Sequence, residues 1–361
     1  MRMIRTGKFA DKKILLIDKE SKTKNDRTWC FWEIKNGFFD DIVCKKWDTI
    51  SFLSNDFSSD MIIAPYQYKM IRGIDFYQYC FNEIKKQQNI DIHYGDISQV
   101  LRHKEGITIY INREMFHFDY AIIFNSILPK DNKSPGIIRL LQHFKGWVIE
   151  TSQAAFDPDK AVFMDFRVEQ KDATTFAYLL PISSTKALVE YTLFSKDLLP
   201  DEAYETELDR YLNDILQVKD YRIIEKEFGV ISMTNRTFLF REDIDLYNIG
   251  TAGGQTKASS GYTFQFIQKQ AAIIVDHLVK NRDLSKIPRT PGRFHFYDKV
   301  LLDVLYNKRV TGKDIFTSLF RKNKPQQVLK FLDNESSITE ELKIISTLPT
   351  FPFLKAAFKQ I

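Results

Sequence analysis

The sequence has 361 residues, of which 44% are hydrophobic and 14% aromatic, and its net charge is +5. This apolar content is enough for one large or two medium globular domains, and it excludes a disordered chain. No apolar run approaches the length needed to cross a bilayer, so we expect a protein without a transmembrane helix.

The basic amino terminus lacks the apolar segment and cleavage site of a signal peptide, so we expect a cytoplasmic protein. Cys30, Cys44 and Cys80 are too far apart for a disulfide framework or a Cys-x-x-Cys pair, and no metal site is expected. Residues 280–361 contain sixteen Lys and Arg against eight Asp and Glu. No nucleic-acid-binding motif accompanies this excess, so we expect no nucleic-acid partner; an anionic membrane surface fits better.

The first predicted strand covers residues 13–18, a short apolar run that ends in Asp18. We expect it to be a buried parallel strand that follows a helix ending near residue 8. Asp18 fits the carboxylate that binds a ribose in dinucleotide sites, although aspartate is also common in turns at strand ends. A helix is then predicted over 74–88, followed by strands over 90–94, 106–112 and 115–125.

From about residue 142 the pattern changes to strands in which aromatic and polar residues alternate, with a helix over 201–216. This pattern predicts a mainly antiparallel region. Asp165 and Glu190 lie within its strands, among aromatic neighbours. A carboxyl group in such surroundings has a raised pKa and stays protonated at neutral pH, as a general acid must. Alternatively, both acids face water on the exposed side of an antiparallel strand.

The most informative local motif is 246–264, where a strand-like run precedes Gly250, Gly253, Gly254, Ser259, Ser260 and Gly261 and then an amphipathic helix. Glycines between a strand and a helix let backbone N–H groups approach a phosphate or the edge of an electron-rich ring. A tight turn that needs positive φ would require the same glycines. No nucleophile elbow, phosphate-binding lysine loop or histidine pair at ligand spacing is present in the sequence.

Six segments together resemble the lycopene β-cyclase family, flavoproteins of carotenoid biosynthesis. They are NDRTWCFWE (25–33), QHFKGW (142–147), MDFR (164–167), LVEYT (188–192), GVISMT (229–234) and IGTAGGQTKASSGYTF (249–264). The resemblance implies an α/β (α+β) fold like that of flavin monooxygenases. In it, a doubly wound FAD-binding domain occupies 1–141 and 235–285, a mainly antiparallel substrate domain 142–234, and a helical region 286–361.

The resemblance also implies a reaction. Lycopene β-cyclases convert the ψ ends of lycopene into β rings, through γ-carotene to β-carotene: an end is protonated, the carbocation closes a ring, and a neighbouring proton is lost. This is an isomerisation by an intramolecular lyase. Reduced FAD would stabilise the cation, and NAD(P)H would keep the flavin reduced. The substrates would be lycopene and related acyclic carotenoids. The enzyme would reach them as a peripheral protein on the inner face of the membrane.

Carried over by position, Glu190 matches the first acid of a Glu-Glu-Thr type motif and would be the proton donor. The second acid is replaced by Tyr191, so either Tyr191 or a more distant residue such as Asp165 would assist proton return. Asp18 would bind the ribose of FAD. The second flavin-contacting segment would use Gly250, Gly253, Gly254, Thr256, Gly261 and Tyr262.

Family members begin with a strand and a GxGxxG phosphate loop, and this sequence contains no GxGxxG. We therefore expect that this first strand and loop are missing, through a start assigned downstream or a fragment, and that FAD binding is weak. Two other functions remain open: a flavin-dependent monooxygenase of an apolar substrate, and a degenerate carotenoid-binding protein without cofactor.

The basic C-terminal region offers two apolar groups flanked by lysines. They are Ile315, Phe316, Leu319 and Phe320, and then Phe351, Phe353, Leu354 and Phe358. Such stripes predict either helices that dock on a membrane surface or helices that cover the core. The oligomeric state is left open by the sequence.

Overall fold

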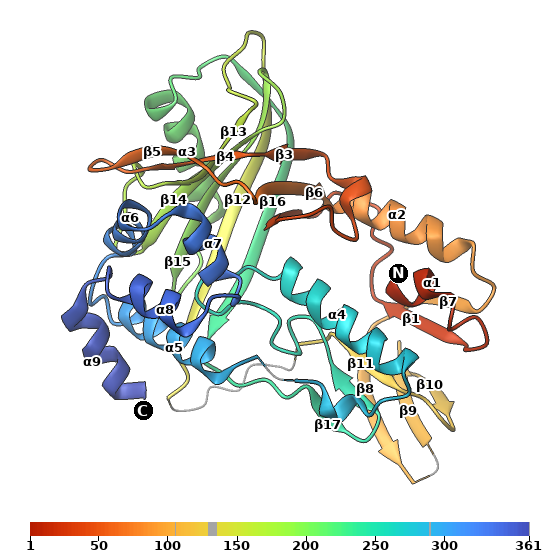
Figure 1. The fold of residues 1–361 in the computed structure, drawn as a ribbon. Helices are drawn as coiled ribbons and strands as arrows, with labels where there is room; N and C mark the ends of the chain where they lie inside the picture. The colour runs from red at the N-terminus through yellow and green to blue at the C-terminus, as the bar shows by residue number, and fades with distance from the viewer. Residues whose placement is uncertain (105, 129–135, 289, 361) are drawn as a thin grey trace.

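The computed structural model describes residues 1–104, 106–128, 136–288 and 290–360. A seven-stranded sheet dominates it, in the order β16-β12-β15-β14-β13-β4-β5 (Figure 1). All neighbours are antiparallel except β13 and β4. The strands are β4 (Thr49–Leu53), β5 (Ser58–Ile62), β12 (Arg139–Thr151), β13 (Lys160–Asp165), β14 (Thr174–Pro181), β15 (Lys186–Ser195) and β16 (Tyr221–Thr234).

The antiparallel strands predicted after residue 142 are confirmed. The sheet extends beyond the predicted substrate domain, because β4 and β5 come from the range 1–141 that was assigned to FAD binding. That range also includes Glu105 and residues 129–135, which lie outside the described residues.

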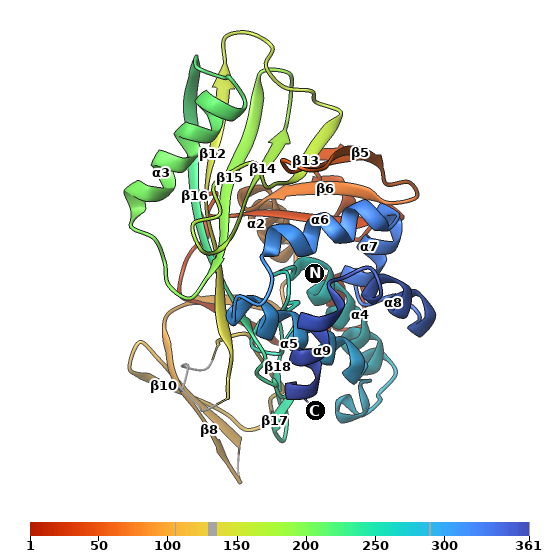
Figure 2. The same ribbon diagram turned by 90° about the vertical axis from the view of Figure 1, so that its left-hand side faces the viewer.

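Both faces of the large sheet are covered, but by different elements (Figure 2). On one face, Tyr204, Leu208 and Tyr211 form a buried core with β15 and its neighbours; they belong to α3 (Asp201–Arg210) and the π-helical turn Tyr211–Ile215. On the other face, Phe163 and Phe176 pack with α6 (Gly312–Lys322) and α7 (Pro325–Leu332). Successive residues of each strand therefore enter opposite cores.

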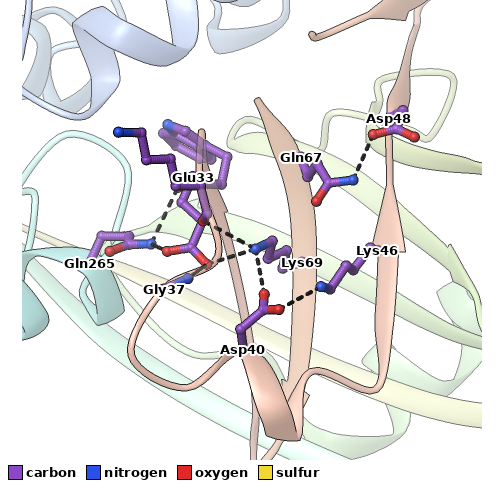
Figure 3. Close-up of polar contacts among 10 residues, drawn as sticks. Glu33, Gly37, Asp40, Lys46, Asp48, Gln67, Lys69 and Gln265 are labelled. Atoms are coloured by element: carbon purple, nitrogen blue, oxygen red, sulfur yellow. Dashed lines mark hydrogen bonds and ion pairs between the residues drawn. The ribbon is translucent and has the colours of Figure 1, made fainter. Parts of the chain in front are cut away.

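A small sheet of β2 (Thr28–Glu33), β6 (Gln67–Arg72) and β3 (Lys45–Trp47) is fixed by a buried ion network (Figure 3). Lys69 Nζ lies 2.8 Å from Glu33 Oε1 and 2.7 Å from Asp40 Oδ1, and its side chain is fully buried. Gln265 donates a hydrogen bond of 3.2 Å to Glu33. The network thus joins the sheet to α4 (Phe264–Val279), the helix after the glycine-rich segment.

The predicted parallel strand at 13–18 is confirmed as β1 (Ile14–Asp18), which pairs in parallel with β7 (Ile90–Tyr94). The prediction that it is buried is wrong: Leu15 and Leu16 are 40% and 41% exposed. In the described part of the chain β7 is the neighbour of β1, and a second parallel pair, β11 (Ile123–Asn125) with β18 (Leu246–Asn248), belongs to a separate sheet. The expected missing N-terminal strand stays a prediction.

The remaining elements surround these sheets (Figure 1). Near β1 lie α1 (Arg2–Thr6), α2 (Gly73–Lys85), and the meander β8 (Ile97–His103), β9 (Gly106–Ile111) and β10 (Glu114–Phe118). Short pieces are the 3-10 turns Asp40–Ile42 and Leu284–Lys286 and the strand β17 (Arg241–Asp243). The C-terminal helices besides α6 and α7 are α5 (Gly292–Tyr306), α8 (Ile338–Ile345) and α9 (Thr350–Gln360).

The C-terminal helices divide between the two expected roles. The apolar stripe of α6, which includes Phe316 and Phe320, is at most 5% exposed, so it belongs to the core. On α9, by contrast, Phe351 and Phe358 are 78% and 77% exposed, while Phe353 packs partly against the core. In the described residues no helix is both long and apolar enough to cross a bilayer.

This division predicts two different effects on stability. Phe316 is 2% exposed and stacks on Phe166, so Phe316→Ala should lower the free energy of unfolding by about 3–5 kcal/mol, the usual cost of removing a buried phenyl ring. Phe351→Ala should change it by less than about 0.5 kcal/mol. Urea denaturation of both variants measures the difference, and equal effects would contradict the packing of α6.

Candidate active site

A cavity of about 760 Å³ lies where the large sheet meets the small sheet and the glycine-rich segment. Five of the six motif segments provide lining residues; MDFR does not. The lining includes the exposed side chains of Leu128, Phe228 and Val230, so the cavity reaches the surface beside β16. Its inner part is formed by Tyr68, Tyr178 and Leu180, which are all buried. The cavity thus combines an apolar mouth with an aromatic interior.

Glu190 is the acidic group in that interior. It lies on β15 opposite Tyr178 of β14 and Gly146 of β12, and directly paired residues share a face of the sheet. The residue lines the cavity and is only 9% exposed. The alternative in which Glu190 faces water is therefore wrong, because the C-terminal helices and the small sheet cover this face.

A second carboxyl group, that of Glu227, approaches Glu190 across β12, the strand that lies between β15 and β16. Gly146 is paired with Glu190 on one side and with Glu227 of β16 on the other. A Cβ at position 146 would lie 3.0 Å from Glu190 Cγ and 2.9 Å from Glu227 Cγ. Glycine therefore leaves the space in which the two side chains approach each other. Thr28 holds Glu227 from the small sheet, donating a hydrogen bond of 2.8 Å to Oε2.

This pair has unusual protonation behaviour. Burial raises the pKa of Glu190 well above its ordinary value, and the negative charge of Glu227 raises it further. Burial also raises the pKa of Glu227. Two adjacent carboxyl groups in a buried position cannot both ionise at low cost, so both shifts favour a form of the pair that keeps a proton. The structure thus places a carboxyl group whose protonated form is favoured on the wall of a cavity.

The two residues considered for proton return, Tyr191 and Asp165, lie elsewhere. Tyr191 follows Glu190 on the same strand, so it enters the opposite core, against α3. The Asp165 carboxylate is held by Arg167 at 2.6 Å and by the Tyr211 hydroxyl at 2.9 Å. Neither residue lines the cavity. In the structure the group beside Glu190 is Glu227.

The glycine-rich segment forms one wall of the cavity through Gly254, Thr256, Gly261 and Tyr262. Gly254 and Gly261 have φ of +74° and +73°, so the prediction of a turn that needs positive φ is confirmed. Gly250 and Gly253 shape the turn behind this wall without lining the cavity. The tight turn is thus confirmed, and the approach of this backbone to a phosphate or a ring edge stays a prediction.

Unpaired polar atoms also face this part of the cavity. Gln142 Oε1 and Ser260 Oγ are buried and, among the atoms described, have no hydrogen-bond partner. At Gly261 a Cβ would lie 2.1 Å from Gln142 Oε1, so any side chain there would take the space beside that oxygen. Arg27 and Arg236 add positive charge to the lining. These features suit a ligand with polar edges and an anionic portion.

The C-terminal region closes the far side of the same segment. Lys257 Nζ lies 2.6 Å from Asp298 Oδ1 of α5 and donates a hydrogen bond of 2.9 Å to Asn334. Ser259 donates to the same Asp298 oxygen at 2.6 Å. Lys257 and Asp298 are both buried, so these contacts fix the helices of 286–361 on the cavity wall.

Asp18 lies apart from the cavity. Its Oδ1 accepts a hydrogen bond from the backbone N–H of Glu20 and lies 3.5 Å from Lys22 Nζ. This is the geometry of a turn at a strand end, one of the two interpretations that the sequence allowed for Asp18. Asp18 does not line the cavity, and its role toward a ribose stays a prediction. In the described residues there is also no cluster of side chains suited to a metal ion.

The family described as lycopene cyclase protein matches residues 5–358 of this sequence. The chain belongs to the lycopene cyclase family. Solved structures show that this family member has the fold of flavin-dependent enzymes, as predicted. A flavoprotein/dehydrogenase from Cytophaga hutchinsonii aligns at a TM-score of 0.63 with 10% identity, covering 99% of this chain and 94% of that one.

Two further structures have the same fold. The p-nitrophenol 4-monooxygenase of Pseudomonas putida aligns at a TM-score of 0.59 with 11% identity, covering 94% of this chain and 92% of that one. A geranylgeranyl bacteriochlorophyll reductase-like protein of Thermoplasma acidophilum aligns at 0.54 with 12% identity, covering 99% and 92%. At such identities the comparison concerns the fold alone.

Sequence reasoning missed three site residues of this cyclase-family protein: Glu227, Gly146 and Thr28. Each lies within or two residues from a quoted motif. The alternation in EKEFGV places Glu225 and Glu227 on one face of a strand, which is a detectable signal. The pairing over Gly146 was not detectable, because the register of β12 with β15 and β16 depends on contacts between distant segments.

The buried pair predicts a pH dependence of stability. Because the folded pKa values exceed those of the unfolded chain, the unfolded chain loses these protons first as pH rises, and the contribution of the pair to stability falls. A Glu190→Gln, Glu227→Gln double variant should therefore gain stability over the wild type between about pH 5 and about pH 8, by about 1.4 kcal/mol for each unit of pKa shift. Denaturant titrations of both proteins across this pH range test the prediction. If their free energies of unfolding change with pH in parallel, the two carboxyl groups have ordinary pKa values in the folded protein.

Proposed function

We propose that this protein is a lycopene β-cyclase that uses Glu190 as its proton donor. The observation that carries the proposal is the buried carboxyl group of Glu190, beside that of Glu227, on the wall of a cavity lined by residues of five of the motif segments. Protonation of a carbon–carbon double bond requires an acid that keeps its proton at neutral pH, next to an apolar substrate, with water excluded. The burial of Glu190 beside Tyr68, Tyr178 and Leu180 supports this role.

The reaction then follows from the lining. The ψ end of lycopene lies along the apolar cavity, and the Glu190 O–H bond breaks as a C–H bond forms at the terminal double bond. The resulting carbocation closes a six-membered ring and loses a neighbouring proton, so no atoms are gained or lost. The aromatic faces of Tyr68 and Tyr178 stabilise the positive charge. Burial raises the pKa of both tyrosines, so they stay neutral.

The residues present fit FAD as the cofactor. Gln142 and Ser260 offer unpaired polar atoms to a flavin ring edge, and the segment around Gly254 and Gly261 lets backbone approach it. Arg236 offers a positive charge to the pyrophosphate, as does Arg27, which is paired with Asp26 in the structure. When bound, a reduced flavin supplies an electron-rich ring that stabilises a nearby carbocation. NAD(P)H is the proposed reductant. The isomerase class separates this proposal from a monooxygenase, because anaerobic turnover without oxygen incorporation is expected.

The first test replaces the proton donor. Glu190→Gln removes the acidic proton with little change in size, so cyclisation should fall by about 10²- to 10⁴-fold, the usual contribution of a general acid. β-Carotene formation in a lycopene-accumulating host measures it, with bound flavin and thermal unfolding as checks on the fold. Glu225→Gln is a matched control on β16, since Glu225 is hydrogen-bonded to Asn25. Near-normal activity of Glu190→Gln would reject the assignment.

We further propose that α9 binds the inner surface of an anionic membrane and gives the enzyme access to its hydrocarbon substrate. Phe351, Leu354 and Phe358 are exposed on this helix, and exposed Lys355 and Lys359 lie beside them. Leu342 of the adjacent α8 is also exposed. Aromatic side chains flanked by lysines are typical of helices in the membrane interface, where each cation adds about 1 kcal/mol on an anionic leaflet.

Liposome flotation tests this surface. Phe351→Ser with Phe358→Ser should reduce flotation with anionic liposomes, because both rings are largely exposed. The control, Met115→Ser with Tyr120→Ser, removes exposed apolar side chains on and beside β10, far from α9 (Figure 2), and should float like the wild type. Equal flotation of all three proteins would reject a role for α9.

A further inference from the structure

We propose that Glu227 is a positioning residue that shares one proton with Glu190 across Gly146, so that Glu190 holds this proton at neutral pH and regains it after each turnover. The inference rests on the proposed function, since the proton serves cyclisation. To that function it adds a second acid, far from the first in sequence, and a glycine that leaves the two side chains room to approach each other.

The first support is the register of the sheet. Glu227, Gly146, Glu190 and Tyr178 form a row across four strands, each directly paired with the next. All four therefore lie on one face, toward the cavity. Both glutamates are less than 10% exposed. The two carboxyl groups are thus brought together by strand pairing, which is rigid, rather than by loops.

The second support is an unpaired oxygen. Thr28 donates to Glu227 Oε2, but Glu227 Oε1 is buried and receives no hydrogen bond from any other described group. The neighbour that can donate to it is Glu190, when protonated. A buried carboxylate oxygen without a donor is costly, so a proton held on Glu190 and directed at Glu227 stabilises both groups.

The surroundings leave this pair as the group that titrates. Cys30 of β2, Tyr68 of β6, Tyr178 of β14 and Tyr262 of the glycine-rich segment lie near Glu190, and burial raises the pKa of each, so all four stay neutral. Near Glu227, the charged groups Asp26 and Glu225 are both acidic and raise its pKa further. Neither of these two charges favours full ionisation of the pair.

The proton cycle is then closed. Glu190 transfers its proton to the substrate, leaving two adjacent carboxylates beside a carbocation. The positive charge is stabilised by both carboxylates, whose mutual repulsion makes the pair a strong base. When the ring loses its proton, Glu190 takes it up, the C–H electron pair becomes the new double bond, and the hydrogen bond to Glu227 re-forms. Glu227 does not line the cavity, so it acts through Glu190.

The test is the pH profile of cyclisation by the flavin-loaded enzyme. In Glu227→Gln the negative charge is lost while Thr28 keeps an acceptor, so the basic limb should move to lower pH by about one unit or more. Gly146→Ala, which pushes a methyl group between the two side chains, should move the limb in the same direction, and Glu227→Asp should restore part of the wild-type profile. Glu225→Gln removes a charge that acts on Glu227 more weakly than the Glu190–Glu227 contact, so it should move the limb by much less than Glu227→Gln.

Infrared titration of the protonated carboxyl band gives a readout that needs no turnover. Its midpoint should fall in Glu227→Gln and Gly146→Ala. A lower rate with an unmoved limb and an unmoved midpoint would overturn the proposal, because it would show a merely structural role. If the midpoint falls in the variants but the wild-type enzyme forms no cyclic product, the proposed function is rejected and the shared proton is supported. Gly146→Ala keeps the test decisive where Glu227→Gln fails to fold.

Discussion

Two carboxyl groups buried side by side must share a proton or pay a large electrostatic cost, and the site is arranged around this constraint. Neither glutamate could stay in a dry interior fully ionised. Their proximity requires a residue without a side chain on the strand between them, which Gly146 provides. It also requires a donor for the remaining oxygen, which Thr28 provides from another sheet. The chemistry therefore depends on the joint placement of β2, β12, β15 and β16.

The rest of the fold maintains that placement. The large sheet has one apolar core against α3 and another against α6 and α7, so it cannot twist or slide without opening either. Lys69 ties the small sheet, which carries Thr28, to the helix after the glycine-rich segment. Lys257 ties the glycine-rich segment to α5. Two buried lysines in ion pairs thus connect the walls of one cavity.

Much of this could be predicted from the sequence, because the signals were local. Alternation predicted the antiparallel strands, glycine spacing predicted the turn with positive φ, and the motif LVEYT indicated Glu190. What failed depended on non-local pairing. The prediction that β1 is buried was wrong because the residues of a strand do not reveal how many strands lie beside it. Asp165 was considered for the site because it is an acid in a strand, yet its carboxylate is bound by Arg167 and by Tyr211, which belongs to the other core.

The alternation of β15 has a consequence for how a pair of adjacent acids in this motif should be understood. Tyr191 stands where the family resemblance places a second acid, and its side chain packs against Tyr204 and Leu208 on the far side of the sheet. An acid at that position on this fold would be separated from the substrate by the thickness of a β-sheet. Adjacent residues of the motif would then lie on opposite faces of the sheet, one lining the cavity and the other packed in the core against α3. The residue that completes the acid chemistry is found on another strand, at position 227.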